Sequence, residues 1–289
     1  MVNKELGDFL RARRAGLTPE EIGLPVEPGR RVTGLRRGEV ARLAGVSAEY
    51  YTRLEQGRAG QPSEQVLHAL SGALRLDDVE RRHLFTLAGT AARKPDRGER
   101  STRVRPAMRQ VLESMHLCPA YVRDDNLEIV AGNALWALVF PDIAALPRRE
   151  RNMVRWTLLD PRARAVWRDW EQVARDYVHV LRLAAAAQPR NQRITNLIGE
   201  LMVRSPEFPG WWSEHRVHER SAGRKRIHHH LVGDLELHFE IFTPVADPAL
   251  SMLVYSAPPG SPSEERLRLL ASWGSESAAA APHSADAGS

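Results

Sequence analysis

Residues 35–58 read LRRGEVARLAGVSAEYYTRLEQGR and contain two short segments with helical spacing of apolar residues, one on each side of Gly45. A glycine between two helices accommodates the left-handed conformation that ends the first and turns the chain sharply. Ser47 then offers its hydroxyl as the N-cap of the second helix. Two helices joined by so tight a turn are typical of a helix-turn-helix, whose second helix enters the ~12 Å wide major groove of DNA.

Three flanking segments also show helical spacing of apolar residues. They are residues 4–15, 63–74 and 78–87. Each segment is too short to form a stable helix alone, so its apolar stripe requires packing against the others. Residues 1–90 are therefore predicted to fold as a five-helix, lambda-repressor-like DNA-binding bundle.

The second helix of the motif is expected to read bases with the side chains opposite the apolar face of Tyr51 and Leu54. These side chains are Ala48, Glu49, Thr52 and Arg53. Arg53 is suited to donate a pair of hydrogen bonds to guanine, Glu49 to accept from a cytosine amine, and Thr52 or Ala48 to touch a thymine methyl. A structural alternative is that Glu49 and Arg53, four residues apart, form an intrahelical ion pair.

A second set of residues is expected to hold the phosphate backbone. It comprises Arg37, the backbone amides near Ser47, Gln56 and Arg58. Phosphate contacts supply affinity and orientation without reading sequence. For Arg30, Arg31 and Arg36, solvated surface charge is the preferred interpretation.

Charge and composition support this division of the chain. Residues 1–105 contain 20 Lys and Arg against 14 Asp and Glu, a net of +6, whereas residues 106–289 contain 21 against 22. A basic N-terminal part indicates a polyanionic partner. The apolar runs are shorter than the ~20 residues that cross a bilayer. The single cysteine, Cys118, and an N-terminus without the pattern of a secretory signal predict a cytoplasmic protein with no membrane partner.

The rest of the chain is expected to form a second, mixed α/β domain. Residues 91–105 are polar and are interpreted as a linker, residues 106–273 as the domain, and residues 274–289 as a disordered tail. A hairpin at Asp125-Asn126, a long helix from Asp160-Pro161 onward, and three strands near 225–230, 234–242 and 251–257 are predicted. Two strands, a helical middle and three more strands are the order of a PAS-like sensor.

Aromatic side chains of this domain are candidates for lining an apolar pocket. The candidate ligand-binding residues are Trp136, Trp156, Trp167, Trp170, Phe208, Trp212 and Phe239. An ordinary filled core would contain the same residue types, so the sequence leaves both interpretations open. A zinc site at the histidines of residues 215–238 is rejected, because no cysteine, HExxH motif or helical His pair accompanies them.

The sequence resembles a known family, the XRE-type helix-turn-helix regulators that carry an MmyB-like ligand-binding domain. The resemblance covers nearly the whole chain. Its N-terminal marks are LGDFLRARR, the motif at 35–58, PSEQVLHALSGALRL and ERRHLFTLAG; its C-terminal marks are PAYVRD, GNALWA, RNMVRWTLLDPRAR, LIGELMVRSPEFPGWW and VGDLELHFEIF. The resemblance implies a PAS-like sensor domain and a small apolar ligand of fatty-acid type.

The sequence thus predicts a transcriptional regulator that binds an operator in double-stranded DNA and is not an enzyme. No G-x-S-x-G elbow or Walker loop is present. A homodimer is expected, because one recognition helix reads few base pairs. No cofactor is expected apart from a bound fatty acid or similar apolar ligand. The alternative function is a small-molecule carrier or metal-dependent hydrolase centred on the second domain.

Overall fold

The computed structural model describes residues 4–25, 30, 32–89, 103–215 and 221–280. These residues divide into two compact units. The N-terminal unit comprises the described parts of Met1–Glu99, Val178–Ile198 and Pro206–Glu219, and the C-terminal unit comprises the remainder. Most of the expected linker, residues 91–102, lies outside the described residues.

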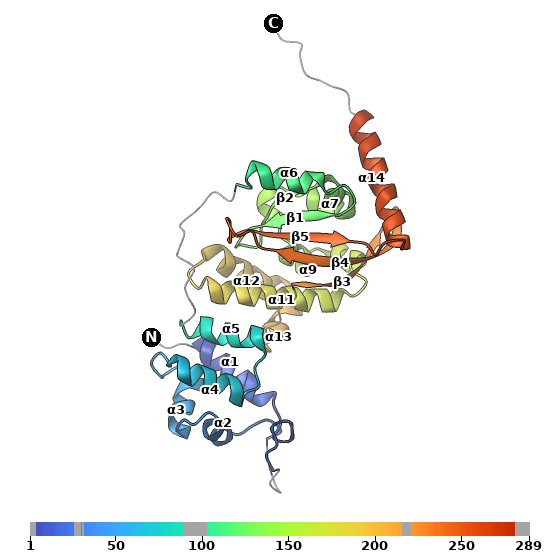
Figure 1. The fold of residues 1–289 in the computed structure, drawn as a ribbon. Helices are drawn as coiled ribbons and strands as arrows, with labels where there is room; N and C mark the ends of the chain where they lie inside the picture. The colour runs from blue at the N-terminus through green and yellow to red at the C-terminus, as the bar shows by residue number, and fades with distance from the viewer. Residues whose placement is uncertain (1–3, 26–29, 31, 90–102, 216–220, 281–289) are drawn as a thin grey trace. The chain divides into compact units, whose positions relative to one another are not determined.

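Five α-helices build the first part of the N-terminal unit (Figure 1). They are α1 (Lys4–Ala15), α2 (Arg37–Leu43), α3 (Ala48–Glu55), α4 (Glu64–Ala73) and α5 (Asp78–Leu87), with a short 3-10 turn, η1 (Glu20–Ile22), after α1. Phe9, Tyr51 and Leu70 are fully buried in their common core. The predicted helical bundle is confirmed, and its core forms because each helix contributes one apolar stripe.

The turn between α2 and α3 has the predicted chemistry. Gly45 adopts a φ of 64°, in the left-handed region. The Val46 amide bonds back to the Ala41 carbonyl at 2.9 Å, and the Ser47 hydroxyl accepts from the Tyr50 amide at 3.0 Å. These bonds satisfy backbone groups at the end of α2 and the start of α3, so they fix the angle at which α3 leaves the bundle.

Helices α1 and α3 approach each other unusually closely at Gly7. A β-carbon at this position would lie 2.3 Å from the Glu55 carbonyl oxygen. Arg11 donates to the same carbonyl at 3.1 Å. A glycine is therefore required by the packing of the two helices rather than by its backbone angles.

The C-terminal unit is built on a five-stranded antiparallel sheet with the order β2-β1-β5-β4-β3. The strands are β1 (Ala120–Arg123), β2 (Ile129–Gly132), β3 (Ala222–His229), β4 (Gly233–Phe242) and β5 (Ser251–Ser256). Leu235, Leu237 and Phe239 alternate with exposed polar residues along β4. This period of two places one face of the strand in the core.

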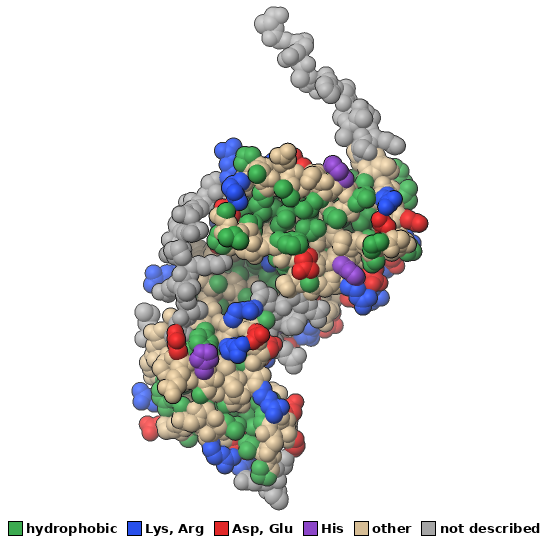
Figure 2. Space-filling model, in the orientation of Figure 1, with side chains coloured by type: hydrophobic (Ala, Val, Ile, Leu, Met, Phe, Trp, Pro, Cys, Tyr) green, Lys and Arg blue, Asp and Glu red, His purple; other side chains and the backbone are tan. Residues whose placement is uncertain are grey.

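Helices cover parts of both faces of the sheet (Figure 1). The helices after residue 105 are α6 (Pro106–Ser114), α7 (Ala134–Val139), α8 (Pro141–Ala144), η2 (Arg148–Glu150), α9 (Met153–Leu159), α10 (Pro161–Val166), α11 (Trp170–Ala187), α12 (Gln192–Arg204), α13 (Phe208–Ser213) and α14 (Pro262–Ala280). Of these, α13 and parts of α11 and α12 belong to the N-terminal unit. Leu112 of α6 packs on Ala120 and Val122 of β1. Apolar side chains gather over α6, β1 and β5 on the face shown in Figure 2.

Three sequence predictions require correction here. The long helix expected from Asp160 is two helices, α10 and α11, because Trp167 leaves the helical path to form an antiparallel β-bridge with Ile227. Residues 274–280 of the tail expected to be disordered continue α14 to Ala280, through a run of alanines with high helix propensity, and residues 281–289 lie outside the described residues. Val104, expected in the linker, is buried in the core under α6.

Among the described residues, no helix combines the length and the apolar character needed to span a membrane.

The close approach at Gly7 generates a stability prediction. Gly7→Ala forces a methyl group against the Glu55 carbonyl, and we expect it to lower the free energy of unfolding by about 1–3 kcal/mol, as overpacked sites do. Gly72→Ala is the matched control, because Gly72 is helical and a β-carbon added there would meet no atom within 4 Å. The control is expected to raise stability by roughly 0.5–1 kcal/mol. Urea titrations followed by circular dichroism measure both, and equal effects would refute the close approach.

Candidate DNA-binding interface and ligand-binding core

The surface of α3 divides into a buried face and an exposed face. Tyr51 and Leu54 are buried in the bundle. Ala48, Glu49 and Arg53 are exposed, and Thr52 is half-buried. The structure therefore brings the four predicted base-reading residues together on the solvent side of one helix.

The ion pair between Glu49 and Arg53, the structural alternative to base reading, is absent from the described part of the chain. Neither side chain has a hydrogen-bond or ion-pair partner among the described residues. Both therefore keep their full hydrogen-bonding capacity for a partner outside the protein. Thr52 differs, because its hydroxyl donates to the Ala48 carbonyl at 2.7 Å. It offers a methyl group and an acceptor lone pair rather than a donor.

The predicted backbone-contacting residues frame α3. Ser47 lies exposed at its N-terminus, where free amide groups attract phosphate. Gln56 and Arg58 follow its C-terminal end and are exposed, and Arg58 donates to the Gln56 side chain at 3.3 Å. Arg37, at the start of α2, has a side chain that is 47% exposed.

A buried carboxylate, Glu55, joins three helices below this surface. Its side chain has no exposed area. Arg14 of α1 donates through Nε to one carboxylate oxygen at 2.5 Å, and Arg37 of α2 donates through Nε to the other at 2.7 Å. Arg14 also donates to the Leu35 carbonyl at 2.7 Å. A buried charge requires such partners, because an unpaired ion in a protein core is strongly destabilising.

The ion network keeps Glu55 charged. Burial alone would raise the pKa of Glu55, but the hydrogen bonds from Arg14 and Arg37 hold that pKa below its ordinary value of 4.5. Sequence reasoning missed this network. The available signal was that Glu55 lies four residues after Tyr51 and one after Leu54, which places it on the buried face of the helix.

Arg37 therefore has a role that the sequence did not predict. One of its nitrogens, Nε, is engaged by Glu55, while the exposed part of the side chain is accessible from solvent. The guanidinium has further donors at its end. The geometry allows Arg37 to support α2 against α3 and to meet a phosphate with the same group.

The interpretation of Arg30 as a solvated charge is wrong. Its side chain is only 6% exposed, and it donates to both carboxylate oxygens of Glu39 at 2.6 and 2.8 Å. It also donates to the carbonyls of Val32 and Gly34. The Arg30 hydrogen bonds hold the pKa of Glu39 at about 2. Arg36 is exposed, as expected, and Arg31 lies outside the described residues.

Four of the seven predicted ligand-binding residues meet in the core of the C-terminal unit. Trp136, Trp156, Trp167 and Phe239 are buried there with Tyr121, Phe140 and Tyr255. Neighbouring rings lie 5.5 to 6.5 Å apart between centroids, for example 5.5 Å for Phe140 and Trp167. These are ordinary packing distances for aromatic pairs. We call these seven residues the aromatic core.

The other three predicted residues lie elsewhere. Trp170 is half-buried, with the Arg164 guanidinium 3.6 Å from its ring centroid. Phe208 and Trp212 stack on each other at 5.3 Å in the N-terminal unit. They are separated from the other candidates because α13 belongs to that unit rather than to the sheet.

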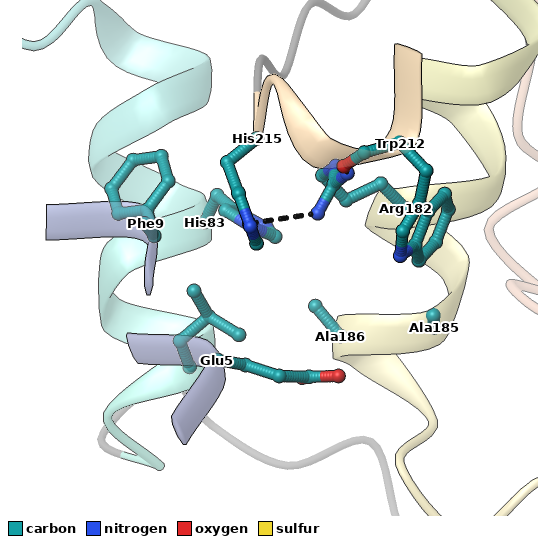
Figure 3. Close-up of a pocket in the computed structure, with 9 residues that line it drawn as sticks. Glu5, Phe9, His83, Arg182, Ala185, Ala186, Trp212 and His215 are labelled. Carbon is teal, nitrogen blue, oxygen red and sulfur yellow. Dashed lines mark hydrogen bonds between the residues drawn. The ribbon is translucent and has the colours of Figure 1, made fainter. Parts of the chain in front are cut away.

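A small cavity of about 10 Å³ borders Trp212 within the N-terminal unit (Figure 3). Buried Arg182 of α11 lies 4.2 Å from the Trp212 ring centroid and donates to the Trp212 carbonyl and to His215. Phe9 and His83 line the same cavity, and burial lowers the pKa of His83 to about 3. A space of this size holds a water molecule at most, so it is not a ligand site.

Comparison with known families agrees with both halves of this description. A model of the MmyB-like transcription regulator ligand binding domain matches residues 104–270, more than half of the chain. The chain belongs to this family. A helix-turn-helix domain model matches residues 5–84. A comparison with curated proteins found no match.

This MmyB-like regulator is therefore a DNA-binding transcription regulator with a ligand-binding domain, and the families that it matches are regulatory rather than enzymatic. Two histidines of the region once considered for zinc have protein partners. His228 shares Asp234 with Arg168, and His229 bonds to the Leu138 carbonyl at 2.9 Å. Among the described residues, no group of three or more His, Cys, Asp and Glu side chains is arranged to hold a metal ion.

The buried ion network predicts a pH-dependent stability. Because the folded pKa of Glu55 lies below 4.5, its contribution is fully present above pH 4.5 and is lost as the pH falls through the folded pKa. We expect Glu55→Gln to lower the free energy of unfolding at pH 7 by about 3 kcal/mol. The difference in the free energy of unfolding between this variant and the unmodified protein should become smaller below pH 4.5.

Glu49→Gln is the matched control, since Glu49 is exposed on the same helix. Urea titrations between pH 7 and pH 3 give the free energies. The charged network is not stabilising if Glu55→Gln lowers the free energy of unfolding by the same amount at every pH in this range. The same conclusion follows if Glu55→Gln and Glu49→Gln lower it equally.

Proposed function

We propose that this MmyB-like regulator binds an operator as a homodimer through α3 and responds to a small apolar ligand of fatty-acid type in its C-terminal domain. The observation that supports this most is the exposed face of α3. On it, Glu49 and Arg53 are charged, adjacent and unpaired within the described chain. Helix α3 is capped by Ser47 and tied to α1 through the ion pair of Glu55 with Arg14, so it presents these groups in a fixed orientation.

Each residue of this surface has a role in the proposal. Arg53 donates to guanine O6 and N7, and Glu49 accepts from a cytosine amine. Ala48 and the methyl group of Thr52 contact thymine. The amides near Ser47, with Arg37, Gln56 and Arg58, hold the phosphates and set the position of α3 in the groove.

The proposed sensor is a PAS-like domain. Two strands, a helical middle and three more strands, joined in one antiparallel sheet, support this assignment. The proposed ligand site is the aromatic core, whose side chains provide apolar surface for an acyl chain. Of the lining predicted from the sequence, Trp136, Trp156, Trp167 and Phe239 remain in the proposal, because they lie together.

Helix α11 connects the sensor to the DNA-binding helices through the chain itself. Its residues up to Tyr177 belong to the C-terminal unit, and those from Val178 belong to the N-terminal unit. In the proposal, ligand and DNA binding are coupled, so the affinity for the operator changes when the ligand binds.

The two arginines provide a test of DNA reading. We expect Arg53→Ala to reduce the free energy of binding to the operator by about 1–3 kcal/mol. It should also relax the preference at one symmetric base pair, with little effect on binding to random DNA. Arg37→Ala should weaken binding to both the operator and random DNA, and it should reduce the slope of log affinity against log salt concentration by about one per protomer. Operators selected from random sequence should contain two half-sites about 34 Å apart or a multiple of it.

Fluorescence anisotropy at two salt concentrations measures both variants on both DNAs. Because Arg37 also bonds Glu55, the melting temperature of each variant is measured first, and DNA binding is compared well below it. Arg42→Ala provides a control at an exposed arginine of α2 outside the proposed contacts. Equal losses on operator and random DNA for Arg53→Ala would reduce this residue to a phosphate contact.

Ligand sensing is tested with medium-chain acids. We expect dodecanoic acid to raise the melting temperature, because a ligand that binds the folded state stabilises it, and to change the affinity for the operator. Mass spectrometry of the protein purified without denaturation should show a copurified acyl compound. A carrier without regulatory function would bind the acid and leave operator affinity unchanged, and a zinc-dependent hydrolase would be stabilised by zinc rather than by the acid.

A further inference from the structure

Arg182 is a buried cation that has no carboxylate partner among the described residues. It belongs to the part of α11 in the N-terminal unit and is 7% exposed. Its guanidinium donates to the Trp212 carbonyl and, at 3.2 Å, to Nδ1 of His215, whereas its Nε is buried without a hydrogen-bond partner in the described chain. Burial lowers the pKa of Arg182 to about 10. A buried charge without an ion partner is destabilising, so this contact is sensitive to any further positive charge.

Two histidines line the same cavity as this guanidinium (Figure 3). His83 of α5 is buried and lies edge-on to Phe9, with ring centroids 5.1 Å apart, and its Nδ1 has no hydrogen-bond partner among the described residues. His215 follows α13 with a φ of 49°, in the left-handed region that is uncommon for residues other than glycine. Because arginine only donates, Nδ1 of His215 accepts the hydrogen bond from Arg182 and carries no proton in this arrangement.

The other charged groups around the cavity leave its surroundings positive. Glu5 of α1 lines the cavity, but it is exposed and forms no ion pair with Arg182 within the described ranges. For His215, the carboxylate of Asp8 favours the protonated ring, and the charge of Arg182 opposes it. The remaining ions nearby on α1 and α5 are arranged in pairs, Arg11 with Asp8 at 3.1 Å and Arg13 with Glu80.

Protonation of either histidine is unfavourable while this contact is closed. Burial, together with the charges of Arg182 and His215, lowers the pKa of His83 to about 3, and burial and Arg182 lower the pKa of His215. In an open arrangement both rings are hydrated and regain a pKa of about 6.5. The contact is therefore at full strength above pH 6.5. It weakens as the pH falls from there toward the folded pKa values, because only the open arrangement gains protons.

We propose that His83 and His215 form an acid-sensitive latch, which holds α13 and residues 178–187 of α11 against α1 and α5 at neutral pH and releases them when the two rings are protonated. Leu183, next to Arg182, packs on the apolar core of the helical bundle, so one segment supplies both the apolar contact and the buried charge. Release allows water to reach the guanidinium and both imidazole rings. The latch lies within the N-terminal unit and is independent of the proposed operator and ligand.

Thiol labelling at position 186 measures the opening of this contact. Ala186 is a buried residue of α11 that lines the cavity, and Ala186→Cys combined with Cys118→Ser leaves a single thiol in the full chain. The reagent is dithiodipyridine, which reacts with thiols in acid as well as at neutral pH. The labelling rate of the folded protein, divided by the rate in urea at the same pH, gives the opening equilibrium constant. We expect this constant to rise by about 10- to 100-fold from pH 6 to pH 5, since each histidine that gains a proton on opening contributes about tenfold per pH unit.

Three variants in this background assign the pH dependence to particular rings. His83→Gln should reduce the rise in the opening constant by about tenfold, because glutamine gains no proton in this range. His83→Gln combined with His215→Gln should leave the constant unchanged within about twofold from pH 6 to pH 5. His68→Gln is the matched control, because His68 is an exposed histidine of α4 that contacts Phe85, and it should retain the full rise.

Two results overturn the latch. One is an opening constant that does not change with pH when both histidines are present, and the other is a full rise in the variant that lacks both. Should the histidine variants fold poorly, an NMR titration of the histidine rings in the unmodified protein decides the question. A His83 ring that stays neutral until the thiol at position 186 becomes reactive supports the latch. A His83 ring that titrates near pH 6.5 while this thiol stays protected refutes it, because the closed contact then accepts the charge.

Discussion

The DNA-binding part of the molecule depends on one buried charge, the carboxylate of Glu55. Its two oxygens are shared between Arg14 of α1 and Arg37 of α2, and the residue itself ends α3. Removal of Glu55 leaves the mostly buried Arg14 without its carboxylate partner, and removal of either arginine leaves the buried carboxylate with one partner instead of two, which destabilises the folded state. The carboxylate thus specifies the relative orientation of three helices that apolar packing alone would leave adjustable.

This arrangement also connects stability to recognition. The position of Gly7 allows α1 to approach the end of α3, and Glu55 then becomes accessible to Arg14. Arg37 is held by the same carboxylate while much of its side chain faces solvent. A phosphate contact made by an arginine that is already oriented loses less side-chain entropy on binding than one made by a free surface arginine. The core network therefore favours DNA binding without touching DNA.

Local features of the helix-turn-helix were predictable from sequence, and features with distant partners were not. Gly45 and Ser47 act on backbone groups within a few residues, so their identity suffices to predict the turn. The partners of Glu55 lie 41 and 18 residues away, and no local pattern identifies them. The sequence did not predict the burial of Arg30 for the same reason, since its half-buried partner Glu39 belongs to the following helix.

In the C-terminal domain, too, features that depend on residues distant in the sequence were not predictable. The strands and their alternation followed from the sequence, but the break at Trp167 depends on a bridge to Ile227, 60 residues later. The aromatic candidates could be chosen from residue type alone. Only the structure shows that Phe208 and Trp212 belong to the N-terminal unit and are separated from the others.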